Sequence, residues 1–107
     1  MAHPPKKLQH ILWSVDVNHL DIEQDKNYII HQILSYGMIE DFIWLFRTYS
    51  LKDVLKTFTN VPYKDYRPAR FSLIKNYVLG LKSFPMDERF YVKNTPRPLG
   101  QKTPKGL

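Results

Sequence analysis

Four histidines are the residues of this chain whose chemistry most readily suggests catalysis or metal binding. They are His3, His10, His19 and His31, and none of them forms the i, i+4 pair of a helical zinc motif. The chain also has no cysteine that could complete a ligand set. A metal ion needs several ligands that converge on it, and no local spacing supplies them. We therefore expect the histidines to lie on the surface or half-buried, and we expect no metal ion and no other cofactor.

Acid–base, nucleophilic and phosphate chemistry find equally little support. The adjacent acids Glu40-Asp41 and Asp87-Glu88 would point about 100° apart on a helix, and each pair suits helix capping or solubility. Two carboxyl groups share acid–base work only where their surroundings separate their pKa values. The four glycines form no phosphate-binding loop, and the serines have no nucleophile-elbow context. The sequence therefore predicts a protein that is not an enzyme.

Basic residues gather in the second half of the chain, interleaved with Tyr63 and Tyr66. Basic groups pair with phosphates, and exposed tyrosine rings stack on bases. The residues of this candidate nucleic-acid-binding region are Lys64, Arg67, Arg70, Lys75 and Lys82. The same pattern is also typical of a solvated basic edge beside a core helix. Nucleic-acid binding is accordingly the alternative function, not the first.

Large aromatic side chains favour a different kind of partner. The chain contains six Phe, seven Tyr and two Trp, many of which belong in the core of a helical domain. Those that remain exposed are the residue types that protein interfaces use as anchors. The candidate protein-binding residues are Trp13, Tyr36, Trp44 and Tyr49. We therefore expect a non-catalytic protein–protein interaction module.

Helical periodicity runs through most of the chain that must position these residues. The N-cap signals are Asp21, with Gln24 at the capping-box spacing, and Ser50. Gly37 and Pro85 act as stops. The dense apolar residues of the segment after Gly37 suggest a helix that is buried on more than one side. The expected helices span a short segment ending near Trp13, then 21–36, 38–49, 51–59 and 68–81. Residues 86–93 form either one more helical turn or a short extended piece. The predicted fold is all-α, a compact bundle of four to five short helices.

Charge divides the 107 residues unevenly, although the formal net charge is +6. Residues 1–53 carry a net charge of −2 and residues 54–107 carry +8. The last fifteen residues hold four basic and no acidic side chains, three prolines and two glycines. We therefore predict a helical domain over 1–92 and a flexible basic tail over 93–107. The chain has no apolar run of roughly 18–20 residues and no signal-peptide pattern, so we expect a cytoplasmic protein with no membrane partner.

Several short motifs resemble a family of small bacterial all-helical proteins of unknown function. They are Trp13-Ser14-Val15-Asp16, Leu20-Asp21, Ile29-Ile30, Leu34-Ser35-Tyr36-Gly37, Glu40-Asp41, Trp44-Leu45-Phe46, Tyr49, Val54-Leu55-Lys56, Ala69, Phe71 and Leu79-Gly80. The resemblance covers roughly residues 12–81. The chain departs from the family pattern at Ser14, at His31-Gln32 and over 63–67. Members of that family are commonly encoded beside nucleotidyltransferase-type toxins, so the resemblance implies an antitoxin that binds such a toxin. It implies no catalytic residue.

Overall fold

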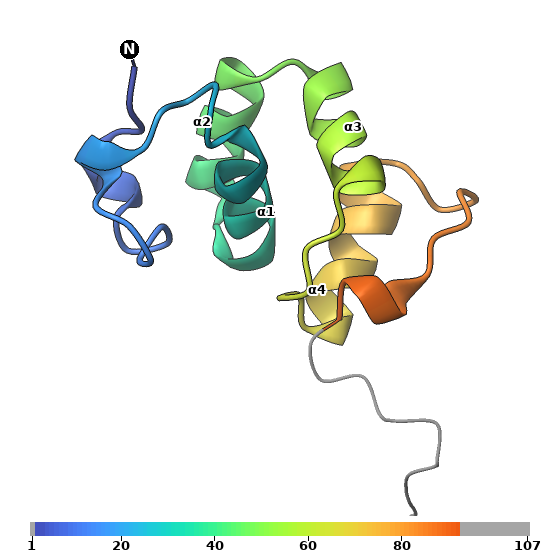
Figure 1. Ribbon diagram of the computed structural model, residues 1–107. Helices are drawn as coiled ribbons and strands as arrows, with labels where there is room; N and C mark the ends of the chain where they lie inside the picture. Colours follow the sequence, from blue (N-terminus) through green and yellow to red (C-terminus); the bar gives the residue numbers. More distant parts are fainter. Residues whose placement is uncertain (1, 93–107) are drawn as a thin grey trace, which may run out of the picture. The chain divides into compact units, whose positions relative to one another are not determined.

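The computed structural model describes residues 2–92 and contains four α-helices (Figure 1). They are α1 (Lys26–Tyr36), α2 (Ile39–Thr48), α3 (Leu51–Asn60) and α4 (Pro68–Leu73). The described residues include no strand, and an isolated parallel bridge joins Tyr66 to Val92. The all-α prediction is therefore confirmed, with the predicted number of short helices. The predicted tail over 93–107 lies outside the described residues.

The chain divides into two compact units, which we describe separately. The N-terminal unit comprises Met1–Tyr63 and holds α1, α2 and α3. The C-terminal unit comprises Lys64–Leu107 and holds α4. A single helical domain over 1–92 stays a prediction. No helix within residues 2–92 combines the length and the apolar character that a membrane crossing requires.

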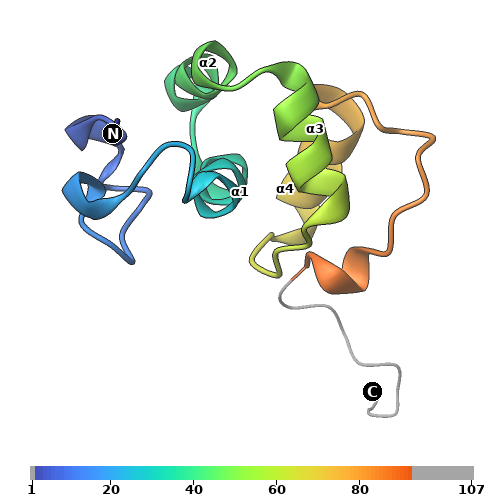
Figure 2. The same cartoon turned by 45° about the horizontal axis from the view of Figure 1, so that its top comes forward.

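The N-terminal unit begins with a 3-10 turn over Lys6–Leu8. Further turns follow, and Leu8, Ile11 and Leu12 are buried. The apolar spacing thus identified core residues correctly, but the backbone forms turns in place of the short helix expected there. In both views this segment, drawn in blue, lies on one side of α1, and α3 lies on the other side (Figures 1 and 2).

Helix α1 begins at Lys26, five residues after the predicted start. Asp21 Oδ2 accepts the backbone N–H groups of Glu23 and Gln24, at 3.0 and 2.7 Å. The reciprocal bond to the Asp21 N–H comes from Asp25 Oδ2 at 2.8 Å, and not from Gln24 as the sequence suggested. The capping signals therefore close a turn of their own, and α1 starts only after that turn.

Gly37 ends α1 as predicted, at a position where the surrounding atoms leave no room for a side chain. Its N–H donates to the Ile33 carbonyl at 2.6 Å. A Cβ atom at position 37 would lie 2.6 Å from that carbonyl oxygen and 3.1 Å from the Asp41 Cβ. No larger residue fits there without a backbone shift, so Gly37 permits the close connection between α1 and α2.

Helices α2 and α3 both pack against α1. The α3 N-cap is Ser50, whose Oγ accepts the Asp53 N–H at 3.1 Å, as the sequence predicted. Within α2 the buried residues are only Asp41 and Leu45. The expectation that this helix is buried on more than one side is therefore wrong, because elements of the N-terminal unit cover only one face of it.

The C-terminal unit continues α4 directly into a π-helix over Ile74–Val78. Gly80 follows with a positive φ of 66°, a conformation that glycine adopts without strain, and it ends the helix before residue 81. Of the segment 86–93, the described residues 86–92 contain both predicted forms, a 3-10 turn over Glu88–Phe90 and then the bridge at Val92. The aromatic core of this unit consists of Tyr66, Phe71 and Tyr91, whose ring centroids lie 5.2 to 6.2 Å apart.

Candidate functional site

Trp13 and Tyr36, two of the predicted protein-binding residues, meet on the surface of the N-terminal unit. Their ring centroids are 4.8 Å apart with an interplanar angle of 62°, an edge-to-face pair. The Trp13 side chain remains 55% exposed, and Tyr36 is half-buried at the last position of α1. The pair therefore presents a large apolar surface to solvent from two different elements.

The loop that carries Trp13 is held by the side chain of Gln9. Its Nε2 donates to the carbonyls of Leu12 and Val15, at 2.6 and 3.0 Å. Its Oε1 accepts the backbone N–H of Val17 at 2.9 Å. One amide thus makes three hydrogen bonds to the loop on either side of Trp13, which restricts the positions that the indole can adopt.

The same loop is also fastened to α1. Tyr28 accepts the Ser14 N–H through its hydroxyl at 3.2 Å. Buried Gln32 donates through Nε2 to the Ile11 carbonyl at 2.9 Å. Sequence reasoning missed these positioning residues because glutamine and tyrosine carry no motif signal, and their partners lie up to 21 residues away.

Trp44 and Tyr49 form a second aromatic pair, with ring centroids 6.3 Å apart and nearly perpendicular planes. Trp44 is half-buried on α2. Tyr49 is only 3% exposed, and its hydroxyl donates to the Ile22 carbonyl at 2.7 Å. Tyr49 is therefore a core residue in this structure.

Burial is the main cause that raises the pKa of Tyr49 well above its ordinary value. Nearby negative charges add to the shift. They belong to Glu23, Asp21 and Asp25. The hydroxyl therefore keeps its proton, and its role as a donor, to a higher pH than an exposed tyrosine would.

The basic residues of the alternative function lie in the C-terminal unit. Lys64, Arg67 and Lys82 are exposed, whereas Arg70 and Lys75 are half-buried. The ammonium group of Lys75 donates to the Lys82 carbonyl at 3.2 Å.

The tyrosines expected to stack on bases beside these cations are not exposed. Tyr66 is fully buried in the core of the C-terminal unit. Tyr63 is half-buried, and its hydroxyl donates to Gln32 Oε1 at 2.9 Å. An exposed ring is instead supplied by Tyr77, in the π-helix of the C-terminal unit.

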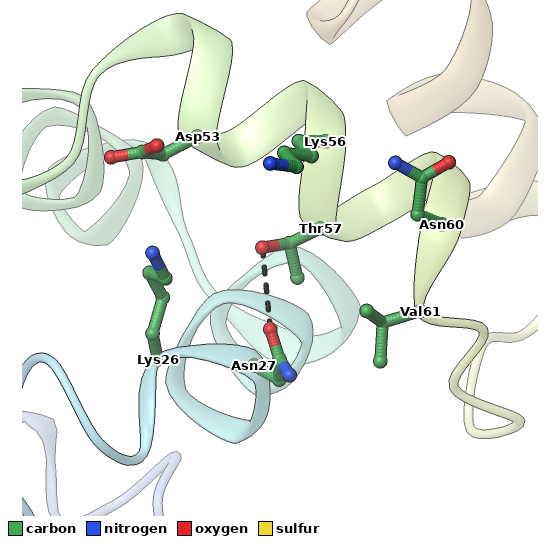
Figure 3. Close-up of a pocket in the computed structure, with 7 residues that line it drawn as sticks. All are labelled: Lys26, Asn27, Asp53, Lys56, Thr57, Asn60 and Val61. Atoms are coloured by element: carbon green, nitrogen blue, oxygen red, sulfur yellow. Dashed lines mark hydrogen bonds between the residues drawn. The ribbon is translucent and has the colours of Figure 1, made fainter.

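A cleft of about 250 Å³ lies between α1 and α3 (Figure 3). Its lining comprises Lys26, Asn27, Asp53, Lys56, Thr57, Asn60 and Val61. The Thr57 hydroxyl donates to Asn27 Oδ1 at 3.4 Å across the cleft. Lys26 extends from α1 toward α3, on the side of the cleft where Asp53 lies (Figure 3). Ammonium, amide and hydroxyl groups equip such a cleft to hydrogen-bond a small polar group.

His31 is fully buried, so the expectation that every histidine is exposed or half-buried is wrong for this residue. Its Nε2 donates to the Val61 carbonyl at 2.5 Å, and its ring stacks on Tyr63 with centroids 5.1 Å apart. Burial lowers the pKa of His31 to about 4, although backbone hydrogen bonds to Val61 and Thr57 oppose that shift. The ring is therefore neutral at pH 7 and acts as a structural donor.

One acid of each adjacent pair, Asp41 and Asp87, has a structural role as the sequence predicted. Asp41 accepts the Met38 N–H at 2.8 Å and caps α2. Asp87 accepts the Arg89 N–H and also pairs with its guanidinium at 2.7 Å. Across residues 2–92, no three His, Asp or Glu side chains gather where they could hold a metal ion.

The comparisons with known proteins reach only part of the chain. No curated protein and no solved structure gives a significant match. The part that matches begins at buried Leu8 in the N-terminal unit and extends through most of α3. It includes Trp13, Tyr36 and the residues that position them. Over residues 8–58 the chain matches the family model of an uncharacterised family, described as a family of unknown function (DUF6922).

Proposed function

We propose that the protein is a non-catalytic protein-binding module whose contact surface includes the Trp13–Tyr36 pair. The observation that carries the proposal is a tryptophan that stays 55% exposed while it packs edge-to-face on Tyr36. Trp and Tyr are the residue types most enriched among interface residues that dominate binding energy. Val15, on the same loop, adds further exposed apolar surface.

The hydrogen bonds of Gln9 support the proposal, because they order the loop before any partner arrives. An anchor that is already held in place loses less conformational entropy on binding. A tryptophan on a freely moving loop would have to bear that entropic cost at the moment of contact. The three hydrogen bonds of the Gln9 side chain thus equip Trp13 to act as a pre-organised anchor.

The candidate partner follows from the family resemblance described from the sequence. It implies a bacterial protein encoded beside a nucleotidyltransferase-type toxin, and an antitoxin role for this chain. The cytoplasmic location in this proposal comes instead from the lack of a signal-peptide pattern in the sequence. In this proposal Trp13 and Tyr36 pack into an apolar pocket on the toxin. The toxin's own activity would then be blocked or restrained by the bound module.

The test is co-expression with the product of the neighbouring gene, followed by size-exclusion chromatography. The two proteins should co-elute at micromolar concentration, and Trp13→Ala should weaken the complex by about 30-fold or more, as expected for a dominant anchor. The matched control is Tyr77→Ala, which removes an exposed aromatic ring of the C-terminal unit and should leave the complex unchanged. Separate elution of the wild-type proteins would overturn the proposed partner.

Nucleic-acid binding is the second candidate function, and one observation favours it. Lys64 and Arg67 are exposed in the same unit as the exposed ring of Tyr77. Basic groups and an exposed aromatic ring in one unit suit a single-stranded nucleic acid, because they combine phosphate pairing with base stacking. The C-terminal unit would carry this function, separately from the Trp13–Tyr36 surface.

A further inference from the structure

Helix α2 has one buried face and one face that is open to solvent. Asp41 and Leu45, four residues apart, point toward the core of the N-terminal unit. Ile39 and Ile43, also four residues apart, are 74% and 47% exposed. At about 100° per residue these two isoleucines lie on the side of the helix opposite the buried pair.

The outward face of α2 has a distinct edge on each side of its isoleucines. One edge carries Phe42 and Phe46, both half-buried. The other edge carries Glu40 and Arg47, both exposed and without an ion-pair partner among residues 2–92. These two charges are seven positions apart in the chain, which places them about 10 Å apart along the helix axis. They therefore lie too far apart to pair with each other.

This arrangement is complementary to itself when two copies meet antiparallel. Two helices related by a twofold axis perpendicular to their length place like edges against each other, with their chain directions reversed. With the axis between residues 43 and 44, Glu40 faces Arg47 of the second copy, and Arg47 faces Glu40 of the second copy. The two Ile43 side chains then lie close to the axis, at the centre of the contact.

We propose that a second copy of this chain packs antiparallel on the outward face of α2. In a parallel pair the charged edge would instead face the aromatic edge of the other helix, and both charges would lose water without gaining a partner. Charge complementarity therefore selects both the partner and its orientation. The surface differs from the Trp13–Tyr36 pair, so this inference stands independently of the proposed function.

The expected dimer is weak and reversible. A helix of ten residues is about 15 Å long, so a contact made mainly by α2 is small. Stable interfaces bury roughly 1,200–2,000 Å² in total, and smaller ones are typical of transient association. The chain should consequently be monomeric when dilute and should form dimers as its concentration rises through the micromolar range and above.

Sedimentation equilibrium of the full chain over a concentration series tests the central contact. The wild type should pass from monomer to dimer as concentration rises. Ile43→Glu places two carboxylates beside the twofold axis and should weaken the dimer by at least about tenfold. The matched control is Leu73→Glu, the same kind of change at a 45% exposed position of α4, which should dimerise like the wild type. Circular dichroism of each variant serves to check that it is folded.

Charge reversal tests the orientation. Glu40→Arg and Arg47→Glu each replace two attractive pairs by two repulsive ones, so each variant alone should dimerise more weakly. An equimolar mixture of the two single variants should regain the dimer, because every contact then joins opposite charges. A wild-type chain that stays monomeric at every concentration would overturn the proposal. So would a dimer that ignores Ile43→Glu, or single variants whose mixture shows no recovery. Trp13→Ala should leave the dimer intact, so a failure of the dimer proposal can be distinguished from a failure of the proposed toxin binding.

Discussion

His31 shows how one buried side chain can set a pH limit on the whole N-terminal unit. Its neutral ring joins α1 to the end of α3 through the Val61 carbonyl. Protonation would place a charge in a fully buried position, and burial already lowers the pKa of this group from 6.5 to about 4. The folded state therefore binds this proton less readily than the unfolded state does.

The first prediction concerns the stability of the fold against pH. Because the folded pKa is depressed, the stabilisation is fully present above pH 6.5 and is lost progressively as pH falls toward about 4. The shift from 6.5 to about 4 corresponds to about 3 kcal/mol of unfolding free energy across that window. Urea unfolding measured at several pH values checks the expected decline.

The control is His31→Gln, which keeps a side-chain donor but removes the titrating ring. The variant should be less stable than the wild type at neutral pH, and its unfolding free energy should change less between those two pH values. Equal slopes for the two proteins would show that His31 does not carry the effect. The proton resonances of His31, followed by NMR, should also show no titration near pH 6.5, the unperturbed value.

At the scale of elements, short-range capping determines where the helices begin and end. Ser50 was predictable as the α3 N-cap, because its partner lies only three residues away. Asp21 was recognisable as a capping residue, yet its reciprocal partner, Asp25, was not. Pattern and local spacing do not reveal whether a capped turn continues directly into a helix.

A second prediction follows for the α2 N-terminus. Asp41→Ala leaves the Met38 N–H without its acceptor, and removal of a helix cap of this kind costs about 1 kcal/mol of unfolding free energy. The neighbouring acid provides the control, since Glu40 is exposed and makes no capping hydrogen bond within residues 2–92. Glu40→Ala should change stability by less than about 0.5 kcal/mol when measured at low protein concentration. Chemical unfolding compares the two variants, and equal losses would contradict the capping role.

For the whole molecule, the charge is divided between the two units. Among the described residues, 2–63 carry six basic and seven acidic side chains, whereas 64–92 carry six basic and three acidic ones. An anionic partner would therefore meet a favourable field mainly at the C-terminal unit. The total of +6 conceals this division.

A third prediction tests nucleic-acid binding as the alternative function. Affinity for a single-stranded oligonucleotide should fall steeply with salt, because binding releases counterions from the phosphates. The double variant Lys64→Glu, Arg67→Glu should bind much more weakly and with a smaller salt dependence. The control, Lys6→Glu with Lys7→Glu, makes the same change at exposed positions of the N-terminal unit and should bind like the wild type. No binding by the wild type at low salt would exclude this alternative.

The sequence by itself determined the all-α class, the extents of α2 and α3 to within a residue or two, and the capping roles of Ser50 and Gly37. Each of these depends on residues only a few positions apart. It also selected Trp13 and Tyr36 by residue type, although nothing local indicated that the two rings would meet. Only the tertiary structure decided that Tyr49 and His31 are buried and that α2 leaves its isoleucines exposed. Burial depends on which distant segments cover a side chain, and the carbonyls that bind Tyr49 and His31 lie 27 and 30 residues away.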